Sequence, residues 1–173
     1  SIKKNLKAIS ENKMDYSIRP VLIMEKKNLE NIISEVFTPL GFKKKGNNWT
    51  LINNEITKII NLQKSQYSNK FYINYGYIIN SIPLNGLKMH IFSGFGSVNS
   101  SVNANINELL DLDSTINDAE RQLELYTLIK DNLFEKLQAI NTEEELSNYL
   151  KALQLPLSNM IPRIVRNYFN IPF

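Results

Sequence analysis

The residues best suited to proton transfer are few in this sequence. His90 is the single histidine and cysteine is absent, so paired-histidine zinc motifs, thiolate metal sites and cysteine nucleophiles are excluded. A lone histidine within a strand more often forms a structural hydrogen bond than acts as a base. We therefore predict no catalytic residue, no metal and no cofactor. An enzyme of unknown reaction using His90, Lys64, Ser65 or Tyr72 is an alternative hypothesis.

A run of three lysines is the strongest candidate for nucleic-acid binding. Lys43, Lys44 and Lys45 precede Trp49, so ammonium groups could contact phosphates while the indole stacks on a base. Lysines on a strand also commonly form a solvated sheet edge, and a lone tryptophan is commonly buried. Nucleic-acid binding through these four residues is therefore an alternative hypothesis.

Uncharged polar residues alternate with apolar ones in two predicted strands. With Ile60 and Leu62 of one strand and Phe71 and Ile73 of the next turned to the core, the opposite face carries amides and a phenol. Such groups form hydrogen bonds without titrating, which suits recognition of another protein more than proton transfer. An ordinary solvated sheet face has the same pattern. The candidate binding residues are Asn61, Gln63, Lys64, Ser65, Tyr72, Asn74 and His90.

The elements that position these residues follow from the spacing of the apolar side chains. Residues 24–40 repeat apolar positions with helical spacing, and Gly41 follows as a cap. Between residues 42 and 95 the period changes to two, which is typical of strands. Short polar turns separate these strands, so an antiparallel meander is expected. The predicted strands span residues 42–45, 48–53, 57–64, 70–79 and 87–95.

Helical spacing returns after a polar stretch, residues 97–105, that we predict to be a loop. A long helix is predicted to end near Ile140, with Asn117 or a neighbour as its N-cap, and Thr142 with Glu145 forms the capping box of a second helix. The predicted fold class is therefore α+β: an N-terminal helix, a four- to five-stranded antiparallel meander, and C-terminal helices packed on one sheet face. Residues 1–23 are predicted to be an N-terminal extension and residues 24–173 a single domain.

Charge is divided unevenly between the two halves of the 173-residue chain. Residues 1–105 contain 14 Lys/Arg and 6 Asp/Glu (+8), and residues 106–173 contain 6 and 11 (−5), which gives the net charge of +3. A basic half can attract nucleic acid or an acidic protein, and the two halves can equally complement each other within one fold.

Nothing in the sequence indicates contact with a membrane. The apolar runs are much shorter than the roughly 20 residues that cross a bilayer, and Ser1 to Asn5 lead into polar sequence rather than a secretion signal. The absence of cysteine agrees with a reducing compartment. We predict a cytoplasmic protein whose partner is another protein or, alternatively, nucleic acid, and we leave its oligomeric state open.

Three segments resemble a known bacterial family. Gly41 to Asn47 ahead of Trp49, then Ile59 to Ser65, then Phe71 to Gly76 resemble the domain-of-unknown-function family 4304. The family has no settled activity, so the resemblance implies the α+β fold without supplying a reaction. Small bacterial domains of this kind often occur among toxin and immunity genes, which implies an immunity-like, protein-binding role by association. The residues that the resemblance singles out are Gln63, Lys64, Ser65 and Asn74.

Overall fold

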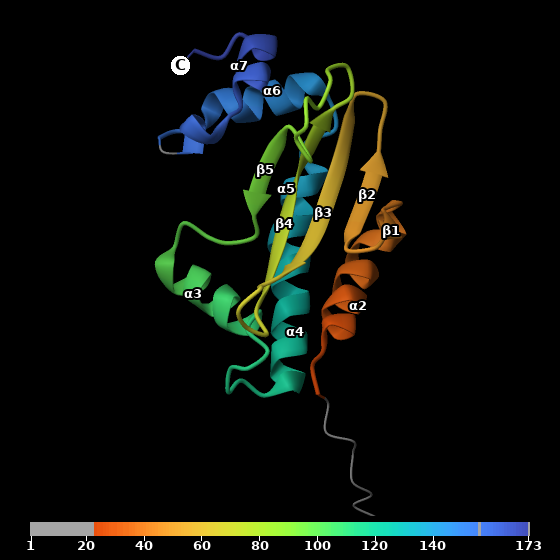
Figure 1. The fold of residues 1–173 in the computed structure, drawn as a ribbon, viewed down its shortest axis with the longest axis vertical. Helices are drawn as coiled ribbons and strands as arrows, with labels where there is room; N and C mark the ends of the chain where they lie inside the picture. The colour runs from red at the N-terminus through yellow and green to blue at the C-terminus, as the bar shows by residue number, and fades with distance from the viewer. Residues whose placement is uncertain (1–22, 156, 173) are drawn as a thin grey trace, which may run out of the picture.

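The computed structural model describes residues 23–155 and 157–172, which form one antiparallel sheet and a set of helices (Figure 1). The sheet has five strands in the order β1-β2-β3-β4-β5, so the predicted meander and the α+β fold class are confirmed. The predicted extension, residues 1–23, lies outside the described residues except for Ile23. The elements are α2 (Lys26–Phe37), η1 (Thr38–Leu40), β1 (Lys43–Lys45), β2 (Asn48–Ile52), β3 (Ile56–Lys64), β4 (Phe71–Ile79), β5 (Ile91–Gly94), α3 (Ser100–Leu109), α4 (Asp118–Leu128), the π-helical turn η2 (Ile129–Leu133), α5 (Phe134–Gln138), α6 (Glu143–Ala152), η3 (Leu157–Met160) and α7 (Arg163–Phe169).

The pairing of β3 with β4 divides the sheet into two chemically different faces. Ile60 lies opposite Tyr75 and Leu62 opposite Ile73, and all four side chains are buried beneath the helices. Successive residues of a strand point to opposite sides, so the residues between them face away from the helices. The predicted alternation of apolar and polar residues is therefore confirmed.

Helix α2 packs against the helix-side face of the sheet, and its buried side chains form part of the hydrophobic core. Its buried apolar side chains, Leu29 and Phe37 among them, have the predicted helical spacing. Gly41 ends the following 3-10 turn at φ +93°, a left-handed conformation that glycine adopts without strain. The chain thereby reverses direction and enters β1.

The long C-terminal helix is interrupted in its middle by a π-helical turn. Leu125, Ile129, Leu133 and Leu137 recur every four residues and are all buried. In a regular α-helix each step of four rotates the side chain by about 40° around the axis, which would carry this row off the sheet. The wider turn at Ile129–Leu133 offsets that drift, so one continuous apolar row stays on the core.

Residues 97–105 contain a helix where a loop was expected. The Asn99 side chain accepts hydrogen bonds from the backbone N–H groups of Ser101, at 3.0 Å, and Val102, at 3.3 Å, and so caps helix α3. Ile106 and Leu109 are the buried residues of this helix. The apolar signal was too weak to distinguish a short, mostly exposed helix from a polar loop.

A buried guanidinium holds the segment between α3 and α4. Arg121 is fully buried, and its Nε donates a hydrogen bond to Asp118 Oδ1 at 3.0 Å. Its Nη atoms donate to main-chain carbonyls at 2.8–3.3 Å. One side chain therefore fixes both ends of the connection. The acceptors are the carbonyls of Glu108, Leu109, Asp111, Ser114 and Ile116.

Among the described residues, no helix has both the length and the apolar character needed to cross a membrane.

Candidate binding face of the sheet

The face of the sheet turned away from the core carries mostly polar side chains, and its strand residues form a candidate binding surface. None of these described strand residues is Asp or Glu. The residues that point to this surface, which we call the open sheet face, are Lys43, Lys45, Asn48, Thr50, Ile52, Thr57, Ile59, Asn61, Gln63, Tyr72, Asn74, Gly76, Ile78, Phe92 and Gly94.

Hydrogen-bonded amides connect three strands at the centre of the open sheet face. Asn61 Nδ2 donates to Asn48 Oδ1 at 2.7 Å across β3 and β2. Asn74 Nδ2 donates to Gln63 Oε1 at 3.0 Å across β4 and β3. These bonds fix the orientation of the amides before any partner arrives, which lowers the entropy lost on binding. Gln63 is exposed, whereas Asn74 is only 7% exposed, so the prediction that Asn74 contacts a partner is wrong and its amide instead holds the Gln63 side chain.

Large apolar and aromatic side chains surround these amides. Tyr72 is 39% exposed, Phe92 53% and Ile52 75%. The Lys70 ammonium lies 5.4 Å from the centre of the Tyr72 ring, a distance at which a cation–π interaction holds both groups. The face therefore combines a rigid aromatic group with fixed hydrogen-bonding groups, a combination common in protein interfaces.

The three lysines of β1 point in two directions. Lys43 lies opposite Thr50 and Lys45 opposite Asn48, so both belong to the open sheet face. Lys44 turns to the other side, where its ammonium lies 3.3 Å from Glu30 Oε2. The hypothesis of a three-lysine phosphate site is thereby reduced to two lysines on one face.

Trp49 cannot stack on a base, as the nucleic-acid hypothesis required. It is fully buried, and its indole N–H donates to Ser34 Oγ of helix α2 at 2.9 Å. The strand period places Trp49 on the same side as Ile60, which lies opposite it. Its role in nucleic-acid binding is therefore a wrong prediction.

His90 is also absent from the exposed surface to which we assigned it. It is 1% exposed, its Nδ1 accepts the Ile79 N–H at 2.9 Å, and its Nε2 lies 3.0 Å from the Pro83 carbonyl. Since Nδ1 is an acceptor, Nε2 carries the proton and donates to that carbonyl. Strand β5 begins at Ile91, later than predicted, and leaves His90 inside the preceding loop.

Leucine at position 90 is expected to lower the free energy of unfolding by about 2 kcal/mol, because the buried Ile79 N–H would lose its acceptor. Urea titration of His90→Leu measures this change. Lys88→Leu is the control, since Lys88 is an exposed residue of the same loop and should change stability by about 0.5 kcal/mol or less. Equal stability of the two variants would contradict the structural role of His90.

Lys64 and Ser65 lie at the end of the β3–β4 hairpin. By alternation Lys64 belongs to the helix-side face, although it is exposed there. The Ser65 N–H donates to the Lys70 carbonyl at 2.8 Å, and Ser65 Oγ accepts the Tyr67 N–H at 3.2 Å, so this serine stabilises the turn. His90 bonds to Ile79 at the opposite end of β4, about 26 Å away at the usual strand rise. The structure therefore does not bring the residues named in the enzyme hypothesis into one site.

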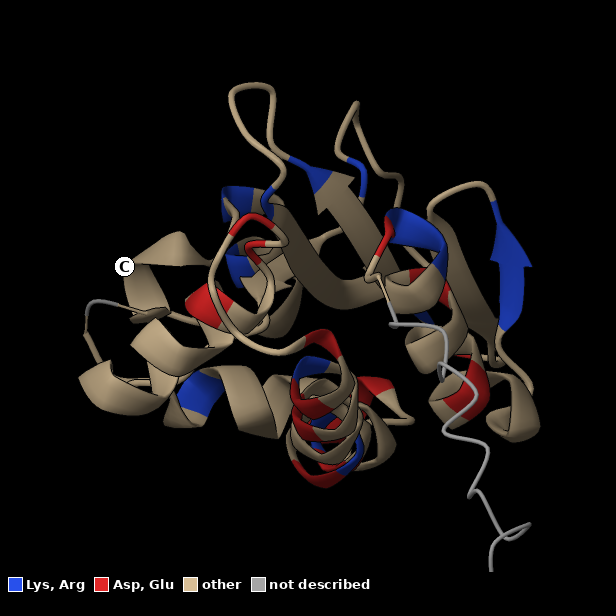
Figure 2. Ribbon diagram, turned by 90° about the horizontal axis from the view of Figure 1, so that it is seen from below, with Lys and Arg blue, Asp and Glu red and all other residues tan. Residues whose placement is uncertain are grey.

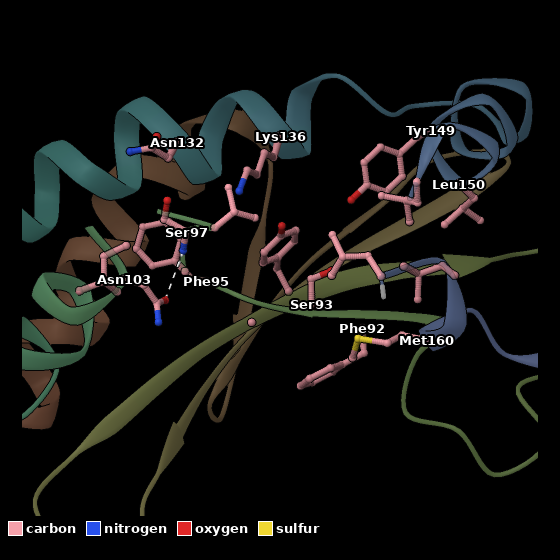
Figure 3. A pocket seen from close by; sticks show the side chains of 18 of the residues that line it. Phe92, Ser93, Phe95, Ser97, Asn103, Asn132, Lys136, Tyr149, Leu150 and Met160 are labelled. Atoms are coloured by element: carbon pink, nitrogen blue, oxygen red, sulfur yellow. Dashed lines mark hydrogen bonds between the residues drawn. The ribbon is translucent and has the colours of Figure 1, made fainter. Parts of the chain in front are cut away.

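A cavity that no sequence pattern indicated lies beside β5, and we call it the β5 cavity (Figure 3). Its volume is about 490 Å³, and its walls come from β4, β5, α3, the π-helical turn, α5, α6 and the segment around η3. These segments are far apart in the chain, so no local motif marks the cavity. The stretch from Gly94 to Gly96 forms part of its wall.

Comparison with known proteins gives one finding. The family described as Domain of unknown function (DUF4304) matches residues 33–139, which is more than half of the chain. The match includes all of β1 to β5 and therefore the whole open sheet face. No curated protein and no solved structure matches the chain. The protein belongs to the DUF4304 family.

Proposed function

We propose that this protein is a non-enzymatic binding module that holds another protein on its open sheet face. The observation that carries the proposal is the hydrogen-bonded set of amides at Asn61, Gln63 and Asn74, beside the exposed Tyr72. Uncharged amides recognise main-chain and side-chain polar groups but do not transfer protons. The expected product is a stable complex without turnover, of the kind that an immunity protein forms, and we expect it in the cytoplasm.

The charge of the open sheet face indicates a partner with an acidic contact surface. Lys43 and Lys45 line one edge and Lys70 lies beside Tyr72, whereas the strand residues described on this face include no carboxylate. In Figure 2 the helix seen end-on carries much of the acidic colour and β1 is basic along its length. A negatively charged partner would therefore be attracted to the sheet and repelled by α4, which favours one orientation of approach.

The test is affinity isolation with the tagged chain from extracts of its source cells, followed by calorimetric titration of the purified partner. The Lys43→Glu/Lys45→Glu variant should bind the partner about 10-fold more weakly, since reversing charges at an interface creates repulsion. The Asn61→Ala/Gln63→Ala variant should also bind more weakly, by loss of hydrogen bonds. The matched control is Lys27→Glu/Lys151→Glu, which reverses two exposed lysines outside the face and should retain binding.

Two results would count against a protein partner held on the open sheet face. The first is that no protein is recovered above background, and the second is that the Lys43→Glu/Lys45→Glu variant binds as tightly as wild type. Nucleic acid is the second candidate, because Tyr72 and Phe92 are exposed aromatic side chains on a face with lysines. Titration of a fluorescent single-stranded oligonucleotide tests it, and binding that weakens steeply with salt and is lost in the same variant would favour it.

A further inference from the structure

The β5 cavity has the size and lining of a small-molecule site. Its volume of about 490 Å³ falls within the range of about 300–1,000 Å³ that is usual for such sites. Buried apolar side chains line it, among them Ile91, Phe95, Ile106 and Leu150. Ligand sites commonly combine apolar walls with polar groups that fix orientation, and this cavity has lining residues of both kinds.

One unpaired positive charge lies in the wall of the cavity. Lys136 lines it, and its ammonium forms no ion pair or hydrogen bond with any described residue. None of the described lining residues is Asp or Glu. A cation beside an apolar cleft without a protein carboxylate is complementary to a ligand that supplies the negative charge itself.

Hydroxyl groups accompany this ammonium. Tyr149 lines the cavity from α6, and Figure 3 shows the side chains of Tyr149 and Lys136 both pointing away from their helices on the β5 side. Burial raises the pKa of Tyr149, so its hydroxyl remains a hydrogen-bond donor at neutral pH. Tyr75 is already hydrogen-bonded to Ser93, and burial raises its pKa too. The Lys136 ammonium and the Tyr149 hydroxyl are therefore available to an anion.

The π-helical turn determines which side of the helix faces the cavity. Asn132 lies within this turn and Lys136 lies four residues later, and both line the cavity. On the neighbouring side of the same helix, Leu133 and Leu137 remain buried in the core. Single π turns within α-helices occur frequently at functional sites, and here the turn lies directly beside the unpaired cation.

We propose that the β5 cavity binds a small apolar molecule with a single carboxylate, of the class of medium-chain fatty acids. The carboxylate pairs with Lys136 and accepts a hydrogen bond from Tyr149, while the hydrocarbon chain lies along the apolar lining. Rim residues extend this apolar surface outward, since Met160 is 68% exposed and Leu157 47%. The cavity shares Phe92 and Gly94 with the open sheet face, but Lys136 and Tyr149 lie outside that face, so the two proposals can fail independently.

Calorimetric titration of the full chain with decanoate and with decanol tests the proposal. The two probes have the same hydrocarbon chain, so their affinity ratio reports the contribution of the carboxylate. Decanoate is expected to bind about 10-fold more tightly than decanol, as expected for a hydrogen bond to a charged group on a partly exposed site. In Lys136→Met this ratio should fall to about one while decanol binding is retained.

Lys130→Met is the matched control, because it removes a lysine from the same helix, and Lys130 does not line the cavity. It should keep the wild-type ratio. The Lys43→Glu/Lys45→Glu variant should keep it as well, since its changes lie on the open sheet face. Equal binding of decanoate and decanol by wild type, an unchanged ratio in Lys136→Met, or no binding of either probe would each overturn the proposal.

Discussion

Methionine in place of Arg121 is expected to lower the free energy of unfolding by about 4 kcal/mol, the largest effect of any single substitution considered. Arg121 is fully buried and supplies the donors for five main-chain carbonyls in the last residues of α3 and in the connection to α4. Methionine fills a similar volume but donates nothing, so each of these carbonyls and the Asp118 carboxylate would lose one hydrogen bond. Chemical denaturation followed by circular dichroism measures the change.

A matched substitution and a conservative one sharpen this test. Arg163→Met removes the same group from an exposed position at the start of α7, and it should change stability by about 0.5 kcal/mol or less. Arg121→Lys keeps the positive charge but cannot reproduce the planar fork of the guanidinium, so it should lose most of the stabilisation. A loss below about 1 kcal/mol in Arg121→Met would show that the loop is held by other contacts.

The second large effect is expected for Gly76→Ala, which should destabilise the protein by about 3 kcal/mol. Gly76 is buried in β4, and a Cβ atom there would lie 1.8 Å from the Ile91 carbonyl oxygen and 2.5 Å from Met89 Sδ. The first of these neighbours is backbone, so strand β5 itself would have to move. Thermal unfolding measures the loss, and decanoate affinity should fall with it, because Ile91 lines the β5 cavity.

Gly94→Ala provides the comparison within the same sheet. A Cβ atom at Gly94 has no neighbour within 4 Å, so the change should alter stability by about 0.5 kcal/mol or less. If both glycine variants unfold at the wild-type temperature, β4 and β5 cannot be as close as the structure has them.

The sheet could be predicted because the pattern that determines it lies among residues close together in the chain. The period of two in β3 and β4 fixed which of Ile60 and Asn61 faces the core, since a shift by one residue would bury the amides. The start of α6 was likewise predictable, because Thr142 and Glu145 form their capping box within four residues of each other. These features depend on neighbours in the chain.

The positions of Trp49 and His90 required long-range contacts that no local pattern contains. The Trp49 indole finds its acceptor on α2, and the His90 ring is enclosed by a loop that reverses through Asn85 and Gly86, both at positive φ. The β5 cavity depends on contacts still more distant, because its walls come from segments between Tyr75 and Ile161. Residue type and spacing alone could not predict such a site.

The lysines of β1 have a consequence for the behaviour of many copies of this chain together. An edge strand with unpaired backbone groups can pair with the same edge strand of another copy and so start an amyloid-like stack. Here the edge strand β1 has three residues, and its Lys43 and Lys45 side chains are exposed. Pairing two copies of β1 would bring these like charges opposite each other. Strand β1 is therefore a poor template for polymerisation, even at high protein concentration.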